Sequence, residues 1–378
     1  MDIKEVRNEI DKIDDEIAKL FAQRMDKAKK VIEIKKQSGL PVFNATRERE
    51  ILNRIADQVP ENYEVYSKVL FSTLFELSRS YQNSLTGESN LEKRIKTALE
   101  NTTEEFPQRA SVACQGVDGA YSELAATKLF SLPNILFFRH FEGVFQAVEK
   151  GLCKYGVLPI ENSSYGSVSE VYDLMKHHNF SIVRTIKMHV SHVLLAKDGA
   201  TLKDIKEVYS HEQAIGQCSE FLRSHPEIKI KVCENTAIAA ETVAKANDKS
   251  VAAISSANCA ELYGLKVVKT GIQNSENNYT RFICISKEPE IYQGANKISV
   301  MLSLPHRPGS LYTVMSKFNS LGINLSKLES RPISGSDFEF MFYFDIDASV
   351  RNEKVIKLLA ELDAESEQFV FLGAYSEI

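Results

Sequence analysis

Several features are missing from this 378-residue sequence, and each absence excludes a class of protein. No apolar stretch reaches the roughly 18 residues of a membrane-spanning helix. The first residues, MDIKEVRNEIDK, are charged and lack the apolar core of a secretion signal. Nucleotide-binding motifs of the GxGxxG or GxxxxGK type are also absent. We therefore expect a cytoplasmic protein that spans no membrane and carries no cofactor.

Cysteine and histidine are too scattered to suggest disulfides or a metal site. The cysteines lie singly in apolar stretches without a CxxC pair, and we expect them to be reduced core residues: Cys114, Cys153, Cys218, Cys233, Cys259 and Cys284. His189 and His192 form the only close pair of non-adjacent histidines, and no cysteine or carboxylate lies near them. We therefore expect no metal site.

The charge and composition are those of an ordinary globular protein. The net charge of −5 argues against bulk binding to nucleic acid. Hydrophobic residues make up 43% of the chain and charged residues 26%, as in folded proteins generally. A chain of this length should hold two or three domains.

The first segment is predicted to be helical. Apolar residues in residues 2–38 recur in steps of three and four, the spacing of an apolar seam: Ile3, Val6, Ile10, Ile13, Ile17 and Leu20. Gly39 and Pro41 should end this helix, which would span roughly 55 Å. That length is too great for a monomeric bundle of about 85 residues, so a second chain is expected to cover its far end. Asn44 should cap a second helix, which Pro60 ends, and a third helix follows at 63–83.

Polar residues recur on shared faces of these helices. Arg24 and Lys35 are 11 residues apart and share a face, as do Ser78 and Gln82. Arg7 lies about 100° around the helix from Arg24, so it could join that face only from a partner chain. Spacing alone favours an ordinary solvated surface.

Residues 1–85 resemble the all-helical chorismate mutase family. The matching positions are Arg7, Arg24, Lys35, Arg47, Glu48, Ser78 and Gln82. In that family the three-helix chains interlock as dimers, and an arginine of the long first helix crosses into the partner's site, a role implied here for Arg7. Asn44 departs from the family, which usually has an aspartate there near the substrate hydroxyl. We expect altered binding at that position and retained activity.

The reaction of that family suits these residue types. Chorismate is a dicarboxylate that rearranges without a nucleophile or proton transfer. The enzyme has to hold the compact conformer and stabilise charge that builds on the ether oxygen. The planar guanidinium groups of the arginines can each bind a carboxylate through two parallel hydrogen bonds. The resemblance places Lys35 and Gln82 at the ether oxygen and Glu48 at the hydroxyl.

Residues 86–106 are polar, and we interpret them as a linker to a second domain at 107–286. Strands and helices alternate there; strands are predicted at 110–114, 135–139, 155–160, 189–195, 208–210, 229–233 and 251–254, and a last one begins at Thr280. This order predicts two α/β lobes between which the chain crosses twice, as in periplasmic-binding-type folds that hold ligands in the cleft.

The central motif of this domain is YGVLPIENSSYGSV, Tyr155 to Val168. An apolar strand ends there in a Ser- and Gly-rich turn, and a helical pattern follows. A strand that leads into such a turn and a helix start can bind an anion. An ordinary capped loop would show the same pattern, so the motif alone leaves both readings open.

Five short motifs, in the same order along the chain, resemble those of the prephenate dehydratase family. The matching pieces are Gly116 to Ser122, Glu161 to Val168, Ser210 to Cys218, Glu234 with Thr236, and Thr280-Arg281-Phe282. The reaction of that family expels water and carbon dioxide from prephenate. It needs a donor at the leaving hydroxyl and anchors for two carboxylates.

The resemblance implies roles for the residues in these motifs. Thr280 is expected near the leaving hydroxyl as a hydrogen-bond donor, with Glu161 or a water supplying the proton. Four residues are expected as neutral donors for substrate oxygens: Asn162, Ser163, Ser210 and Gln217. Glu234 is expected beside them at the site. Arg281 either anchors a carboxylate or orients the loop, and we favour the site role.

Residues 297–378 form a third unit in the order βαββαβ, which is ferredoxin-like. Strands are predicted at 298–304, 324–331, 338–345 and 369–374, with a helix at 352–362. The unit resembles an ACT domain, an amino-acid-sensing module. Two motifs match the phenylalanine-binding motifs of the dehydratase family: Gly309-Ser310-Leu311 and Glu329-Ser330-Arg331-Pro332. The resemblance implies L-phenylalanine as a feedback inhibitor.

From end to end the chain resembles the bifunctional chorismate mutase-prephenate dehydratases of bacteria. The implied ligands are chorismate, prephenate and L-phenylalanine, and the implied assembly is a homodimer or larger homo-oligomer. A competing hypothesis is a non-catalytic sensor, in which the two-lobed domain binds an aromatic metabolite and the helical domain serves only to dimerise.

Overall fold

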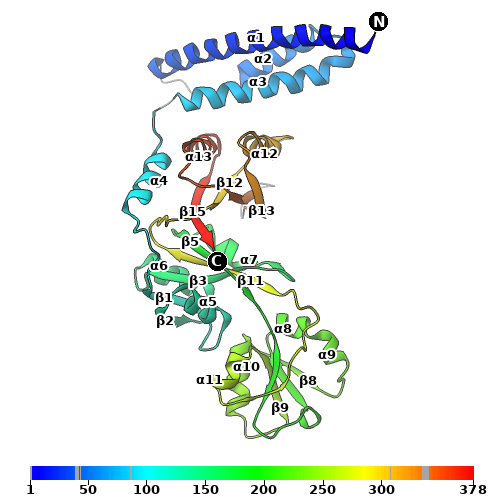
Figure 1. The fold of residues 1–378 in the computed structure, drawn as a ribbon, viewed down its shortest axis with the longest axis vertical. Coiled ribbons are helices and arrows are strands. Elements are labelled where there is room, and N and C mark those ends of the chain that lie inside the picture. The colour runs from blue at the N-terminus through cyan, green and yellow to red at the C-terminus, as the bar shows by residue number, and fades with distance from the viewer. Residues whose placement is uncertain (1, 39–41, 43, 86, 307, 334–339) are drawn as a thin grey trace. The chain divides into compact units, whose positions relative to one another are not determined.

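The computed structural model describes residues 2–38, 42, 44–85, 87–306, 308–333 and 340–378. Its contacts divide the chain into two compact units (Figure 1). The helical unit comprises Met1–Arg94, Leu304–Gly322 and Asn352–Glu367. The α/β unit comprises Ile95–Ser303, Ile323–Arg351 and Gln368–Ile378.

The helical unit contains the predicted helices: α1 (Ile3–Ser38), α2 (Ala45–Ala56), a short 3₁₀ turn (Glu61–Tyr63) and α3 (Glu64–Ser84). Helix α3 packs against both α1 and α2. The predicted cap of α2 is confirmed, because Asn44 Oδ1 accepts a hydrogen bond from the Arg47 backbone N–H at 3.0 Å. The predicted end of α1 at Gly39 and Pro41 lies outside the described residues.

Two helices from the end of the chain, α12 (Ser310–Ser320) and α13 (Glu353–Glu365), belong to the same unit. They are hydrogen-bonded to α3. Ser80 Oγ donates to Glu361 Oε2 at 2.9 Å, and Thr313 Oγ1 donates to Glu76 Oε1 at 2.9 Å. Glu361 is buried and also pairs with Lys317 at 2.7 Å.

The apolar seam of α1 is exposed within a single chain. Ile10, Ile13, Ile17 and Leu20 have 48 to 63% of their surface accessible. Toward the other end of the helix, Ala28 and Ile32 are buried. The helix is therefore packed over only part of its length.

The first lobe of the α/β unit holds strands β1 (Arg109–Gln115), β2 (Leu132–Phe138), β3 (Tyr155–Asn162), β4 (Gly166–Ser167), β5 (Ser181–His189) and β11 (Tyr279–Ser286). Its helices are α5 (Tyr121–Leu129), α6 (Phe141–Glu149) and α7 (Ser169–Met175). Strand β1 runs parallel to β2 and β3, whereas β11 is antiparallel to its neighbours β3 and β5. The prediction of a strand beginning near Thr280 is confirmed.

The C-terminal strands are β12 (Lys297–Ser303), β13 (Asn324–Pro332), β14 (Phe340–Asp347) and β15 (Phe369–Glu377). The described residues place them in one sheet with the first lobe, in the order β13-β14-β12-β15-β5-β11-β3-β1-β2. The junction is a short parallel pairing of Ser376 and Glu377 with β5. Gly373, with φ of 151°, allows this approach, because a Cβ there would clash with the Ile182 carbonyl. Phe338, the predicted start of one strand, lies outside the described residues.

The second lobe is built on a five-stranded sheet, counted over described residues, in the order β10-β6-β9-β7-β8. The strands are β6 (Val193–Ala196), β7 (Glu207–Ser210), β8 (Lys229–Val232), β9 (Val251–Ser255) and β10 (Lys266–Lys269). The helical segments are η2 (Leu202–Asp204), α8 (Glu212–Gln217), α9 (Ser219–Arg223), α10 (Thr236–Lys245) and α11 (Asn258–Leu262).

The chain crosses between the lobes twice, as predicted, but the first crossing corrects a predicted strand. Residues 189–195 are not one strand: β5 ends at His189 in the first sheet, and β6 begins at Val193 in the second. The return crossing lies between β10 and β11. The apolar run on both sides of the crossing concealed the break from sequence reasoning.

The segment interpreted as a linker also needs correction. It contains helix α4 (Asn90–Asn101), on which Leu91, Ile95 and Ala98 are buried. These residues follow the i, i+4, i+7 spacing of one helix face, so the segment is an amphipathic helix. None of the described helices combines the length and apolar character needed to cross a membrane.

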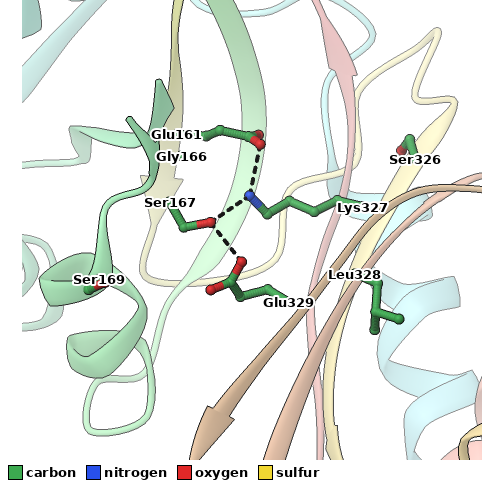
Figure 2. Close-up of a pocket in the computed structure, with 8 residues that line it drawn as sticks. All are labelled: Glu161, Gly166, Ser167, Ser169, Ser326, Lys327, Leu328 and Glu329. Carbon is green, nitrogen blue, oxygen red and sulfur yellow. Dashed lines mark hydrogen bonds and ion pairs between the residues drawn. The ribbon is translucent and has the colours of Figure 1, made fainter. Parts of the chain in front are cut away.

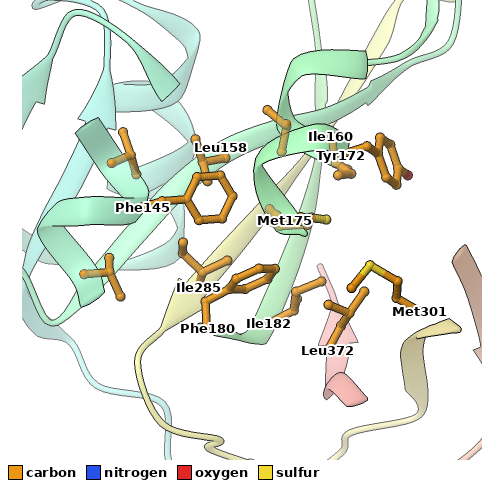
Figure 3. Packing of buried hydrophobic residues seen from close by; sticks show 14 of the residues in the cluster. Phe145, Leu158, Ile160, Tyr172, Met175, Phe180, Ile182, Ile285, Met301 and Leu372 are labelled. Atoms are coloured by element: carbon orange, nitrogen blue, oxygen red, sulfur yellow. The ribbon is translucent and has the colours of Figure 1, made fainter. Parts of the chain in front are cut away.

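A buried core ties the first lobe to the C-terminal strands (Figure 3). Leu158 and Ile285 from the sheet pack with Phe145 of α6. The same cluster includes Met301 of β12 and Leu372 of β15. Five of the cysteines are buried and Cys233 is half-buried; all six are free thiols, as predicted.

Candidate active sites

The helical unit gathers one polar cluster between α1 and α3. The Arg24 guanidinium donates to the Leu74 carbonyl at 2.9 Å and to Ser78 Oγ. The central guanidinium carbon, Cζ of Arg24, lies 5.6 Å from the centroid of the Phe75 ring. Ser78 is buried, so the guanidinium is fixed against α3 by several contacts at once. The Arg24 face of α1 and the Ser78 face of α3 therefore meet.

Charges and burial shape this cluster. Burial lowers the pKa of both Arg24 and Lys35, and the negative charge of Glu48 partly raises both again. Glu48 also forms an ion pair with Arg79. Lys35 Nζ donates to the Val42 carbonyl. The cations of α1 and the carboxylate of α2 therefore share one electrostatic environment.

Gln82 completes the cluster from one turn beyond Ser78. Its side chain is buried, and its Oε1 has no hydrogen-bond partner among the described residues. Buried polar atoms of folded proteins are nearly always paired. The buried amide oxygen of Gln82 is therefore a candidate for contact with a polar ligand.

Three predicted mutase residues lie elsewhere in the chain. Arg7 is exposed and is 17 residues from Arg24, roughly 25 Å along α1. Arg47 points away to an exposed ion pair with Glu50 at 3.2 Å. Asn44 is occupied as the cap of α2. A single chain therefore assembles only part of the predicted set.

In the α/β unit the predicted dehydratase residues centre on the β3–β11 pair. Asn162 and Thr280 are direct cross-strand partners, and Asn162 Nδ2 donates to Thr280 Oγ1 at 3.0 Å. Asn162 Oδ1 accepts the backbone N–H groups of Ser164 and Tyr165 at 2.9 and 3.0 Å, which fixes the orientation of the amide. Because the Thr280 oxygen accepts this hydrogen bond, its own proton remains available for another acceptor.

The second lobe contributes through α8. Gln217 Nε2 donates to Asn278 Oδ1 at 3.3 Å, and its Oε1 lies 2.6 Å from His192 Nε2. Asn278 Oδ1 also accepts from Asn162 Nδ2 at 2.9 Å. Burial lowers the pKa of His192, while the bond to Gln217 partly raises it. Gln217 is therefore placed at the junction of the lobes, as predicted.

Glu161 and Arg281 form a separate cross-strand pair beside Asn162 and Thr280. Successive side chains on a strand point to opposite faces, so this pair faces away from the Thr280 hydroxyl. Arg281 Nη2 lies 3.2 Å from Glu161 Oε2 and 2.7 Å from Asp345 Oδ2. Glu161 Oε1 lies 3.0 Å from Lys327 Nζ. Both side chains are thus held in ion pairs. The expected roles, with Glu161 or a water as the proton source and Arg281 as a carboxylate anchor or loop-orienting residue, stay predictions.

The three remaining predicted residues, Ser163, Ser210 and Glu234, lie in different environments. Ser163 Oγ donates to the Asn277 carbonyl at 2.9 Å and holds the two loops together. Ser210 is fully buried and donates to the Ile254 carbonyl at 2.7 Å, so it supports the second sheet, contrary to the expected substrate contact. Glu234 is exposed and pairs with Arg139 of the first lobe.

A cavity of about 580 Å³ lies on the Glu161 face of β3 (Figure 2). Lys327 of β13 reaches Glu161 and Ser167, and Ser167 Oγ donates to Glu329 at 2.8 Å. Further along β13, Arg331 contacts Ser169 Oγ at 3.1 Å. The strand that bears the second predicted effector motif is therefore in direct polar contact with the turn that follows β3.

The predicted effector residues fall in both compact units. Gly309 caps α12 with φ of 87°, a conformation that favours glycine, and Leu311 follows it in that helix. Ser310 Oγ is buried without a partner among the described residues. Ser330 is exposed on β13, between Glu329 and Arg331.

Comparison with known proteins identifies a family for each of the two regions that carry these clusters. The prephenate dehydratase family profile matches residues 112–290, and the chorismate mutase type II profile matches residues 6–83. A bifunctional chorismate mutase/prephenate dehydratase from Aquifex aeolicus (strain VF5) is 31% identical over 376 residues, which cover 99% of this chain and 98% of the relative. The protein of that description from Escherichia coli (strain K12) is 32% identical, with 98% and 95% covered. The structure of prephenate dehydratase from Arthrobacter aurescens in complex with L-Phe aligns with a TM-score of 0.65 and 28% identity, over 70% of this chain and 89% of that chain.

The fold and the two matched families define an enzyme of aromatic amino acid biosynthesis that carries an isomerase region and a lyase region in one chain. The chain belongs to the bifunctional chorismate mutase/prephenate dehydratases, and it has both activities. The competing hypothesis of a non-catalytic sensor is therefore wrong.

Sequence reasoning missed several residues that contact the predicted dehydratase residues on one face or the other of the β3–β11 pair. Asn278 stands two positions before Thr280, and its position beside the Thr-Arg-Phe triplet was an available signal. His192 was considered only as a metal ligand. Lys327 and Asp345 had no local signal, because their partners are distant in sequence.

Proposed function

We propose that the chain rearranges chorismate to prephenate in the helical unit and converts prephenate to phenylpyruvate in the α/β unit, under feedback inhibition by L-phenylalanine. The observation that carries the proposal is the pair of separate polar clusters, one around Arg24 and Lys35 and one around Thr280. A coupled assay tests it: chorismate is supplied and phenylpyruvate is measured. Release of prephenate without phenylpyruvate would contradict the second step.

In the mutase site, the cations hold a dianionic substrate. Arg24 is fixed by Ser78 and is suited to one carboxylate. Lys35 and Gln82 are assigned to the ether oxygen, where negative charge develops as the bond breaks. Glu48 is assigned to the substrate hydroxyl, and Arg47 to binding at the entrance. Since no proton moves in this reaction, position and charge suffice.

In the dehydratase site, Thr280 donates a hydrogen bond to the leaving hydroxyl of prephenate. Its oxygen accepts from Asn162, which leaves the hydroxyl proton to point at substrate. Gln217 supplies a donor from the second lobe. The leaving hydroxyl takes one proton from the solvent and departs as water. The bond between the ring and its carboxylate breaks to release carbon dioxide, and that electron pair makes the ring aromatic. Glu234, with its partner Arg139, is assigned to the cleft rim.

The proposal includes a homodimer or larger homo-oligomer, supported by the exposed seam of α1. An uncovered row of isoleucines over several turns is unusual for a monomer. A second copy would cover it and would bring its own Arg7 toward the Arg24 cluster. Arg7 would then be the residue that the single chain lacks.

Feedback inhibition has support from two observations. The relative from Arthrobacter aurescens was solved in complex with L-Phe. In this chain, Glu329 of the effector motif contacts Ser167 of β4, and Arg331 contacts Ser169 at the start of α7. Both elements follow β3, whose last residue is Asn162. A ligand that changes the position of β13 would therefore act on the strand that orients Thr280. Gly309, Ser310 and Leu311, the other effector motif, are likewise assigned to phenylalanine binding.

A further inference from the structure

The two segments that connect the lobes carry polar residues that the proposed reactions leave unused. His192 lies on the segment from β5 to β6, and Asn278 lies on the returning segment just before β11. Each side chain has only 2% of its surface exposed. Among the described residues, His192 Nδ1 and Asn278 Nδ2 have no hydrogen-bond partner. Buried polar atoms of this kind are uncommon and require an explanation.

These residues belong to one chain of hydrogen bonds that ends at Thr280. His192 Nε2 lies 2.6 Å from Gln217 Oε1, and Gln217 Nε2 lies 3.3 Å from Asn278 Oδ1. Asn162 Nδ2 lies 2.9 Å from the same Asn278 oxygen and 3.0 Å from Thr280 Oγ1. The chain thus connects the second lobe, both crossing segments and the catalytic strand pair.

The direction of every donor in this chain is determined. The oxygen of Asn162 is occupied by two backbone N–H groups, so its nitrogen must face Asn278 and Thr280. The Asn278 oxygen then receives two donors, one from each lobe. Gln217 can donate to it only if its own oxygen accepts from His192, which sets the neutral His192 tautomer with the proton on Nε2.

We propose that Asn278 is a positioning residue of the dehydratase. The backbone N–H groups of Ser164 and Tyr165 orient the Asn162 amide, and Asn278 adds an acceptor for its nitrogen beside Thr280 and links it to Gln217 in the other lobe. The Thr280 hydroxyl is then aimed at the substrate only when both lobes are in place. The inference rests on the proposed assignment of Thr280 to the leaving hydroxyl.

A double-mutant cycle in the full-length enzyme tests this role. Asn278→Ala removes the side-chain acceptor at 2.9 Å from Asn162 Nδ2 and leaves it the Tyr279 carbonyl at 3.3 Å and Thr280 Oγ1. We expect kcat on prephenate to fall on the order of tenfold, with a smaller change in KM. In a Thr280→Ala background the same change should cost almost nothing more, because the residue it positions is gone. If Asn278 had only a structural role, the fold-losses in kcat of the two single variants would multiply in the double variant.

Controls separate this effect from misfolding. Asn277→Ala removes an exposed neighbouring amide and should keep wild-type dehydratase turnover. The mutase activity of each variant reports an intact helical unit, and a circular-dichroism melt reports the α/β unit. If Asn278→Ala does not fold, Asn278→Ser in the same cycle replaces it.

The outcomes distinguish the inference from the proposed function. Independent, multiplied losses in the double variant, or wild-type turnover of Asn278→Ala while Thr280→Ala is impaired, would overturn the positioning role alone. Wild-type turnover of Thr280→Ala would overturn the assignment of Thr280, and the inference with it.

Discussion

Lys35 is the residue on which the mutase proposal can be tested most directly. Its ammonium group is assigned to the ether oxygen, where charge develops only in the transition state. Lys35→Ala should therefore lower mutase kcat by about 10²-fold or more. Dehydratase turnover of supplied prephenate should persist, because that site is built from other residues of the chain. Equal loss of both activities, measured on the same preparation, would indicate misfolding in place of a catalytic role.

The pH dependence of the mutase gives a second test of Lys35. Burial lowers its pKa from the ordinary value of 10.5, and Glu48 only partly opposes this. The cation is present below the lowered pKa and is lost as pH rises through it, so kcat/KM on chorismate should fall on the alkaline side at a pH below 10.5. Lys35→Arg keeps its charge to higher pH and should move this limb upward. If the alkaline limb of the pH profile lies at the same pH in Lys35→Arg as in the wild type, it reports the titration of another group.

At the scale of the element, strand β3 serves two purposes at once. Its side chains alternate between the two faces of the sheet. Asn162 therefore contacts Thr280 on one face, and Glu161 contacts Arg281 and Lys327 on the other. Helix α3 has a similar division, because Ser78 faces Arg24 while Ser80, about 200° around the helix, faces Glu361. In both elements the residues next to the proposed catalytic groups contact C-terminal segments.

This arrangement predicts that Lys327 couples phenylalanine to the dehydratase. Lys327→Met removes the cation that bridges β13 to Glu161 and Ser167, while Arg281 still pairs with Glu161. The inhibition constant for phenylalanine should rise by about fivefold or more, the usual range of a coupling free energy, with basal turnover near wild type. Lys357→Met, at an exposed lysine of α13, is the matched control. Unchanged inhibition in Lys327→Met would place the coupling elsewhere.

For the whole molecule, the exposed seam of α1 and the distance of Arg7 from Arg24 predict a site shared between two chains. Arg7→Ala and Arg24→Ala enzymes should each have a weak mutase activity. After the two are mixed and allowed to exchange, half of the dimers would be mixed, and each would hold one intact site of two. Recovery should therefore approach about a quarter of wild-type activity. Confirmed exchange of subunits without any recovery would rule out the shared site.

Much of the secondary structure could be predicted from the sequence, because periodicity and turn chemistry are local. The apolar steps of three and four predicted α1, and Asn44 predicted the start of α2. The alternation of strands and helices predicted two lobes and a double crossing. The segment of helix α4 showed only weak helical character and was interpreted as a linker, because three apolar residues in a polar segment give a weak pattern.

The sequence by itself determined which residue types stand in each motif, and hence the class of chemistry, because family motifs are contiguous in the chain. Only the tertiary structure decided which of them meet. Strand register placed Glu161 and Arg281 on the face opposite Thr280, and a change of one residue in register would have reversed this. Pairing of β15 with β5 joined the C-terminal strands to the first lobe through residues nearly 200 positions apart. Such contacts depend on packing across long sequence separations, for which no local pattern of residues carries a signal.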